Sequence, residues 1–113
     1  MVSRDPEDPG NFGKQNVGTY RLEVIGRNRL AIQPVPVHDV AIHLQKAEEK
    51  GEDLPIAITL GNDPVMTIVA GMPMAYDQSE YEMAGACAAP RPIATAPLTG
   101  FDVPGAPRWS SRA

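Results

Sequence analysis

The segment between Val17 and Val35 limits the fold more than any other part of the chain, because its pattern calls for two strands joined by a tight turn. Residues 17–25 and 30–35 are strand-like, and the Gly-Arg-Asn-Arg sequence between them supplies the glycine and asparagine that a tight connection needs. Prolines at positions 34 and 36 end the second strand, since proline cannot donate to a ladder. The sequence therefore predicts a β-hairpin. In its first strand polarity alternates, which places Thr19, Arg21 and Glu23 on one face and Tyr20, Leu22 and Val24 on the core face.

Local start and stop signals divide much of the remaining chain into short elements. Asp39 is placed to cap a helix over residues 39–50, with apolar positions on one face, and Gly51 is placed to end it. Residues 55–60 are typical of a buried strand that stops at Gly61. We expect a loop without a core of its own in residues 1–15, which carry two prolines, two glycines and mixed charge.

Two more helices and a weak strand are predicted in the second half of the chain. Asp63 and Pro64 open a short buried helix that extends over the apolar residues 65–72. Ser79 and Glu82 have the spacing of a capping box, so a helix is expected from Ser79 to about residue 86. Residues 93–98 form a weak strand interrupted by Pro97, and a turn follows at residues 99–100.

The overall composition excludes several classes of function. The 113 residues suffice for one small domain, and a net charge of −4 with scattered Lys and Arg offers no basic stripe to nucleic acid. A single cysteine, Cys87, cannot form an internal disulfide, which gives no indication of an oxidising compartment. The longest apolar run, residues 65–74, is too short to span a bilayer, and no signal peptide is recognisable. We expect a soluble, cytoplasmic protein that binds neither nucleic acid nor membrane.

Five short motifs occur in a fixed order between Asp5 and Ala84. They are Asp5-Pro6-Glu7 before Asn16-Val17-Gly18-Thr19-Tyr20-Arg21, then Gly26-Arg27-Asn28-Arg29-Leu30, Lys46-Ala47-Glu48-Glu49-Lys50-Gly51-Glu52-Asp53-Leu54-Pro55, Leu60-Gly61-Asn62-Asp63-Pro64, and Ser79-Glu80-Tyr81-Glu82. In this order they resemble the motifs of the prenylated-flavin-dependent, UbiD-like decarboxylases, which remove carboxylate from aromatic or unsaturated acids. The sequence around His38 and Tyr76 is most similar to the hydroxyaryl acid branch of that family.

The resemblance implies a fold, a cofactor and a reaction. The expected fold is α+β, a partial split β-barrel of the flavin-reductase-like kind with two or three helices. Residues 16–104 would form this prenylated-FMN-binding domain, after a loop at 1–15 and before an aberrant tail at 105–113. The implied activity is non-oxidative decarboxylation of a hydroxybenzoate-type acid with prenylated FMN and Mn²⁺ or another divalent cation, and K⁺ is a further candidate. A flavin prenyltransferase would supply the cofactor, and the full-length relative would form homo-oligomers.

The same resemblance assigns roles to individual residues. Asn16 and Glu80 match positions that hold the divalent cation, which in turn binds the flavin phosphate. Without the resemblance, Asn16 is a turn residue before a strand and Glu80 is an acid in the first turn of a helix, where the dipole favours it. His38 matches a histidine ligand of some members, whereas a lone histidine before a helix is otherwise a cap or surface residue. These three residues are the predicted metal ligands.

Arg21 is the residue predicted to act on the substrate. In the family, the arginine at this spacing from the metal-binding asparagine contacts the substrate carboxylate and the flavin, and a guanidinium can hold a carboxylate at two points. A surface arginine on a strand is the alternative interpretation. Thr19, Tyr20 and Gln33 match positions that contact the cofactor.

One expected part of the family pattern is missing from the 113 residues. The relatives carry proton-handling acids in a Glu-Gly-Pro-Phe-Gly-Glu-like motif, and this sequence contains no such motif. The final residues, Ala106-Pro107-Arg108-Trp109-Ser110-Ser111, could arise from the expected sequence through a shift of the reading frame. We therefore expect a fragment of a decarboxylase. Two alternatives stay open: a truncated flavin- or metal-binding module without turnover, and a degenerate product without function.

Overall fold

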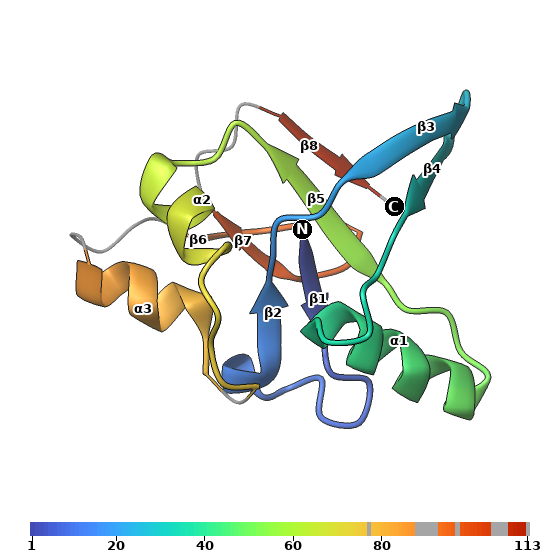
Figure 1. Cartoon of the computed structure of the whole chain (residues 1–113), viewed down its shortest axis with the longest axis horizontal. Helices are drawn as coiled ribbons and strands as arrows, with labels where there is room; N and C mark the ends of the chain where they lie inside the picture. Colours follow the sequence, from blue (N-terminus) through green and yellow to red (C-terminus); the bar gives the residue numbers. More distant parts are fainter. Residues whose placement is uncertain (77, 88–92, 97, 105–108, 113) are drawn as a thin grey trace.

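The computed structural model describes residues 1–76, 78–87, 93–96, 98–104 and 109–112 of the chain. Its elements form an α+β arrangement in which helices lie on either side of a small antiparallel sheet (Figure 1). Their bounds are β1 Val2–Arg4, the 3-10 helix η1 Phe12–Lys14, β2 Gln15–Val17, β3 Leu22–Gly26, β4 Arg29–Ile32, α1 Asp39–Lys50, β5 Ile56–Leu60, α2 Pro64–Val69, α3 Glu80–Cys87, β6 Ile93–Thr95, β7 Asp102–Pro104 and β8 Trp109–Arg112.

The main sheet has the strand order β2-β1-β5-β8, and all its neighbours are antiparallel. Strand β1 lies inside this sheet, where Val2 pairs with Val17 on one side and with Ala57 on the other. Val2 is fully buried. The prediction of a coreless loop at the start of the chain is therefore wrong for residues 2–4. No local turn links β1 to β5, so the short-range pattern could not show this pairing.

The predicted hairpin is present, but it begins later than expected. Strands β3 and β4 pair around a turn at Arg27 and Asn28, and the ribbon projects from the main sheet (Figure 1). Residues 18–21 separate β2 from β3 and have no regular structure, so a single strand from Val17 to Ile25 is wrong. Val24 is 77% exposed, which contradicts its predicted place in the core. The ribbon pairs with no other described strand, and several of its apolar side chains are exposed, among them Val24, Ile25 and Leu30.

Helix α1 has the predicted bounds. Gly51 follows it in the left-handed region with φ of 70°, a conformation that favours glycine at the end of a helix. The buried residues Val40, His43 and Ala47 lie on one face. The cap prediction is wrong by one position, because His38 is the N-cap residue and Asp39 is the first helical residue.

Strand β5 and helix α2 follow the predicted order. The Asp63 side chain accepts a hydrogen bond of 3.0 Å from the Val65 backbone N–H, as expected for an aspartate cap. Helix α2 ends at Val69 rather than near Met72, and Ile68 is 65% exposed, so the helix is amphipathic rather than buried all round.

Helix α3 begins at Glu80, one residue after the predicted start. The predicted capping box is not formed, since the buried Ser79 hydroxyl has no hydrogen-bond partner among the described residues. The hydrophobic core extends from the main sheet to α2, α3 and β7. Its buried members are Val2, Val17, Ala57, Met66, Val69, Ala84, Phe101 and Val103.

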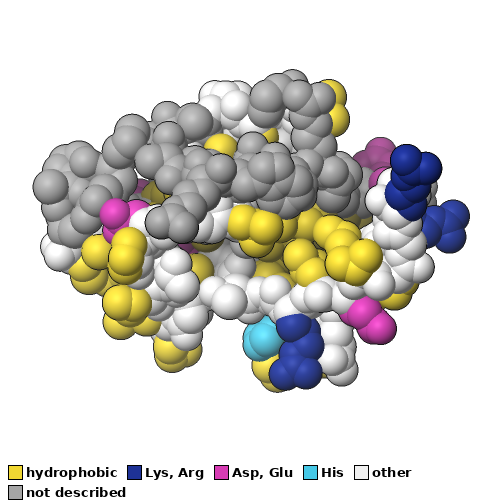
Figure 2. All heavy atoms as spheres, turned by 90° about the horizontal axis from the view of Figure 1, so that it is seen from above, with side chains coloured by type: hydrophobic (Ala, Val, Ile, Leu, Met, Phe, Trp, Pro, Cys, Tyr) yellow, Lys and Arg dark blue, Asp and Glu magenta, His cyan; other side chains and the backbone are white. Residues whose placement is uncertain are grey.

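The fold class is α+β with three α-helices in the described part of the chain, as predicted. A split β-barrel is not confirmed, because the described strands form one four-stranded sheet and two separate two-stranded sheets, which do not close into a barrel. Strand β8 pairs with β5 within residues 109–112, so the prediction of an aberrant tail there is wrong for these residues. Residues 105–108 and 113 lie outside the described residues. Apolar side chains also reach the surface, including those of the ribbon (Figure 2). None of the described helices is long and apolar enough to cross a membrane.

Candidate functional site

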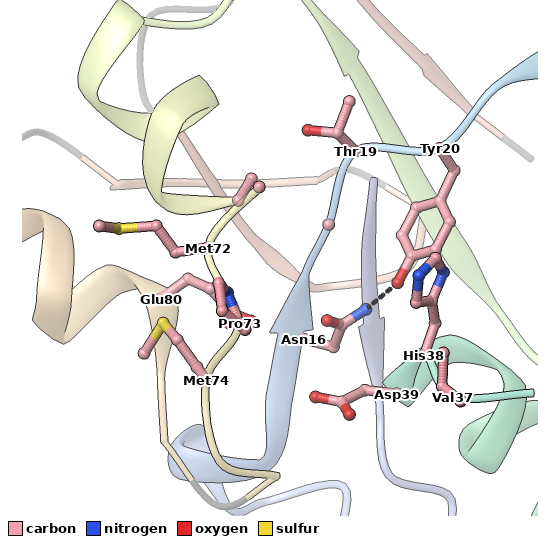
Figure 3. Close-up of a pocket in the computed structure, with 13 residues that line it drawn as sticks. Asn16, Thr19, Tyr20, Val37, His38, Asp39, Met72, Pro73, Met74 and Glu80 are labelled. Carbon is pink, nitrogen blue, oxygen red and sulfur yellow. Dashed lines mark hydrogen bonds between the residues drawn. The ribbon is translucent and has the colours of Figure 1, made fainter. Parts of the chain in front are cut away.

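A cavity of about 430 Å³ lies where the end of β2, the start of α1 and the start of α3 approach one another (Figure 3). The loop after α2, with Met72 and Met74, closes another part of its wall. Helices α1 and α3 lie on opposite sides of β2 and β1, so the cavity exists only when all of these elements are packed (Figure 1). Its polar lining consists of Asn16, Thr19, Tyr20, His38, Asp39 and Glu80.

The carboxamide of Asn16 is held by its nitrogen. Asn16 is 7% exposed, and its Nδ2 donates to the Tyr20 hydroxyl at 3.1 Å and to Ser3 Oγ at 3.5 Å. A primary amide nitrogen has two N–H donors, and both are directed at these partners. Figure 3 shows the oxygen on the opposite side of the amide, towards Glu80 and Met74. The oxygen of Asn16 is therefore the atom available to a group in the cavity.

Glu80 links helix α3 to strand β2. Its Oε2 accepts a hydrogen bond of 3.1 Å from the backbone N–H of Val17, the residue directly after Asn16. The side chain is only 5% exposed, and this burial raises the pKa of Glu80 above its usual value, as does the nearby charge of Asp39, while backbone hydrogen bonds act in the opposite direction. This contact brings the predicted pair Asn16 and Glu80 to one cavity.

Asp39 is a cavity residue for which the sequence predicts only a role as a helix cap. Because it is the first residue of α1, its carboxylate lies at the helix end that faces the cavity (Figure 3). Burial raises the pKa of Asp39, and the charge of His38 lowers it. Its position directly after His38 was the one available sequence clue.

Tyr20 forms the wall between the cavity and the ribbon. Its ring meets that of His38 edge to face, with centroids 5.7 Å apart and an interplanar angle of 70°. Burial raises the pKa of the Tyr20 hydroxyl. The ring also lies so close to Gly18 that a Cβ atom at position 18 would overlap it, which gives a physical reason for glycine in the Asn-Val-Gly-Thr-Tyr-Arg motif.

Five of the seven predicted site residues line this cavity: Asn16, Thr19, Tyr20, His38 and Glu80. Arg21 and Gln33 are exposed and are not among its lining residues. The roles predicted for all seven residues stay predictions, since the cavity lining shows where the residues lie and not what they bind.

The oxygen-rich lining fits a hard divalent cation better than a soft one. Carboxylate and amide oxygens are the ligands that Mg²⁺ and Mn²⁺ prefer. The lining contains two carboxylates, and neither Lys nor Arg is among the described lining residues. No group of three His, Cys, Asp or Glu side chains in the described ranges is arranged to hold a metal without help. An amide oxygen and a ligand phosphate would have to complete the coordination shell.

Comparisons with known proteins agree on one family. The family model described as the UbiD 3-octaprenyl-4-hydroxybenzoate carboxy-lyase Rift-related domain matches residues 1–106. A phenolic acid decarboxylase of Streptomyces sp. (strain D7) is 82% identical over 112 residues, which are 98% of this chain and 23% of that protein. The chain thus spans about a quarter of the length of this relative.

Solved structures give the same picture. The vanillic acid decarboxylase of Sedimentibacter hydroxybenzoicus in its closed form matches with a TM-score of 0.88 at 46% identity, over 91% of this chain and 22% of that one. An evolved dimeric form of the UbiD-class enzyme HmfF from Pelotomaculum thermopropionicum in complex with prFMN matches with a TM-score of 0.82 at 29% identity, over 91% of this chain and 23% of that one.

Proposed function

The chain belongs to the UbiD family, and we propose that it is the part of a hydroxyaryl acid decarboxylase that holds the phosphate of prenylated FMN through a divalent cation. The observation that carries this proposal is the charge of the cavity lining. Asp39 and Glu80 both face a space without a described Lys or Arg, and each is harder to ionise because it is buried. A phosphate can bind there only together with a cation, which neutralises the negative charge of the carboxylates and of the phosphate.

The proposed cation ligands are the oxygen of Asn16, the carboxylate of Glu80 and His38. Asn16 and Glu80 are preorganised, because both are buried. The Asn16 amide donates a hydrogen bond to the Tyr20 hydroxyl, and the Glu80 carboxylate accepts one from the Val17 backbone N–H. The carboxylate and amide oxygens of this set are ligands that suit Mn²⁺. Asp39, which carries no assignment from the family resemblance, adds negative charge at the same wall.

The chain's own contribution to the reaction would be orientation and charge neutralisation. The bound prenylated flavin supplies the electron-accepting chemistry that decarboxylation needs. Thr19 and Tyr20 are proposed to contact the flavin, and Arg21 to hold the substrate carboxylate with its guanidinium. Arg21 and Gln33 lie at the base of the ribbon and are not lining residues, so their proposed contacts are with parts of the cofactor and substrate that extend beyond the cavity lining.

The substrate class is inferred from the relatives. Proteins similar to this chain are named for decarboxylation of phenolic acids and of vanillic acid, which are aromatic acids with a ring hydroxyl. We extend this class to the protein in which this segment acts. Prenylated FMN is supported by the prFMN complex of a UbiD-class relative.

A second candidate function is cofactor binding without turnover by the 113-residue chain itself. The sequence holds no Glu-Gly-Pro-Phe-Gly-Glu-like motif, so the acids that handle the proton in the family would have to come from other residues. Loss of a general acid costs roughly 10²- to 10⁴-fold in rate. We expect the 113-residue chain to bind the cofactor and to release little or no carbon dioxide.

The test is expression of the chain together with a flavin prenyltransferase, followed by a visible absorption spectrum of the purified protein. Wild-type protein is expected to retain the flavin chromophore, and the Glu80→Ala variant to lose it. The matched control is Glu82→Ala, an exposed acid on the same helix, which is expected to retain it. Wild-type protein without chromophore would contradict the proposal, and release of carbon dioxide from 4-hydroxybenzoate would contradict the turnover-free alternative.

A further inference from the structure

A buried serine hydroxyl lies between Asn16, which lines the cavity, and the buried face of helix α1. Ser3 is fully buried on β1, where it pairs with Asn16 of β2 in the sheet register. Its Oγ lies 3.0 Å from His43 Nδ1 and 3.5 Å from Asn16 Nδ2. Three elements thus meet at one hydroxyl, although their residues are as much as 40 positions apart in the sequence.

His43 belongs to the same buried group. It is 1% exposed, and its Nε2 has no hydrogen-bond partner in the described part of the chain. Desolvation lowers the pKa of His43 to about 4, so the ring is neutral at neutral pH; the nearby charge of Asp5 raises the pKa and that of Lys46 lowers it. The Tyr76 ring stands edge to face with it at 5.7 Å.

A neutral imidazole has one ring nitrogen that donates and one that accepts. If His43 Nδ1 accepts the hydrogen bond that it shares with Ser3, the single hydroxyl hydrogen of Ser3 is donated to His43. Ser3 Oγ can then act only as an acceptor towards Asn16. The amide must turn its NH₂ group to Ser3, and its oxygen must face the other way.

We propose that Ser3 and His43 are positioning residues that form a hydrogen-bond relay and fix the Asn16 carboxamide with its oxygen towards the cavity. The relay runs from His43 Nδ1 through the Ser3 hydroxyl to Asn16 Nδ2, and the Tyr20 hydroxyl takes the second amide hydrogen. This role rests on the proposed function, because the oriented oxygen matters only if it holds a cation.

The cavity lining indicates that Ser3 and His43 act indirectly, by orienting Asn16. Neither Ser3 nor His43 lines the cavity, so neither touches a group bound there. Residues that orient a metal ligand from behind typically change metal affinity by about 10- to 100-fold when mutated. That range is the expected effect of breaking this relay.

The experiment measures Mn²⁺ affinity of the 113-residue chain by titration in the presence of saturating FMN, whose phosphate completes the proposed coordination shell, with folding followed by circular dichroism. Ser3→Ala and His43→Leu are expected to weaken Mn²⁺ binding by about 10-fold or more. His43→Asn, whose amide oxygen can accept near the position of Nδ1, is expected to keep more of the affinity than His43→Leu. Thr59→Val, which removes another buried hydroxyl from the neighbouring strand β5, is the control and is expected to leave Mn²⁺ affinity unchanged.

A second readout tests the direction of the relay without a metal. Long-range ¹⁵N–¹H spectra of the wild-type chain are expected to show the ring hydrogen of His43 on Nε2. A hydrogen on Nδ1 would overturn the relay, as would unchanged Mn²⁺ affinity in Ser3→Ala when Asn16→Ala binds weakly. If wild-type and Asn16→Ala bind Mn²⁺ equally, the proposed function fails instead, and the spectrum still decides the direction of the relay.

Discussion

At the scale of single residues, Asp5 is the charge whose burial most needs compensation. Its side chain is fully buried and accepts hydrogen bonds from Lys46 Nζ at 2.8 Å, from the Tyr76 hydroxyl at 2.8 Å and from the Glu7 backbone N–H at 2.9 Å. Burial opposes its ionisation, but these bonds hold the pKa of Asp5 well below its usual range. The Asp-Pro-Glu motif thus ties the start of the chain to helix α1.

Lys46→Met is expected to lower the free energy of unfolding by about 3 kcal/mol at neutral pH, because it leaves a buried carboxylate without its cation. The control is Lys14→Met, which removes a more exposed pair with Asp8 at 3.5 Å and is expected to cost less than about 1 kcal/mol. Urea unfolding of both variants measures the difference. Equal losses would show that the Asp5 carboxylate is stabilised without Lys46.

The pH dependence of stability is expected to carry a contribution from His43. Its pKa is about 4 in the folded chain and has an ordinary value of 6.5, so between these values the unfolded state binds more protons. Stability therefore falls as the pH is lowered through this window, by at most roughly 3 kcal/mol from this residue. His43→Leu should flatten that part of a urea-unfolding pH series. An identical slope in wild type and variant would contradict the assignment.

The sequence predicted some residues of the site but not others. Asn16 and Glu80 were predicted because each stands in a motif, and the structure brings both to one cavity. The Ser3–His43 contact and the place of Asp39 were not predicted, since no local pattern encodes contacts between β1, β2 and α1. Arg21 was predicted to contact the substrate and the flavin, but residues 18–21 leave the sheet and carry it to the ribbon, outside the cavity lining.

At the scale of elements, prediction succeeded where the deciding interactions are local. Helix α1 ends at a glycine, helix α2 begins at an aspartate cap, and the turn of the ribbon has its Arg27-Asn28 pair; each was visible in the sequence. Strands β1 and β8 were missed because each is paired with remote strands. The capping box failed for a different reason: the Ser79 hydroxyl is buried without a partner among the described residues.

Two glycine substitutions should have opposite effects on stability. Gly51→Ala is expected to lower the free energy of unfolding by about 1 kcal/mol, because its φ of 70° strains a residue with a Cβ atom. Gly85→Ala, on the exposed side of α3 with open space at the Cβ position, is expected to raise it by up to about 1 kcal/mol. Thermal unfolding of both variants checks the signs. Stabilisation by Gly51→Ala would contradict the left-handed end of α1.

At the scale of the whole molecule, the cavity is a product of tertiary packing. Strand β2 contributes Asn16, helix α1 contributes Asp39, and helix α3 contributes Glu80. The family resemblance indicated Asn16 and Glu80, but neither the place of Asp39 in the cavity wall nor the absence of Lys and Arg from the described lining residues. That charge balance is the physical reason to expect a cation together with a phosphate.

The central claim is that a divalent cation joins this cavity to a flavin phosphate. The most direct measurement compares the affinity of the chain for FMN and for riboflavin, which lacks the phosphate, with and without Mn²⁺. We predict that Mn²⁺ tightens FMN binding, leaves riboflavin binding unchanged, and loses its effect in the Glu80→Ala variant. Equal FMN affinity with and without Mn²⁺, or an equal gain for riboflavin, would contradict the account.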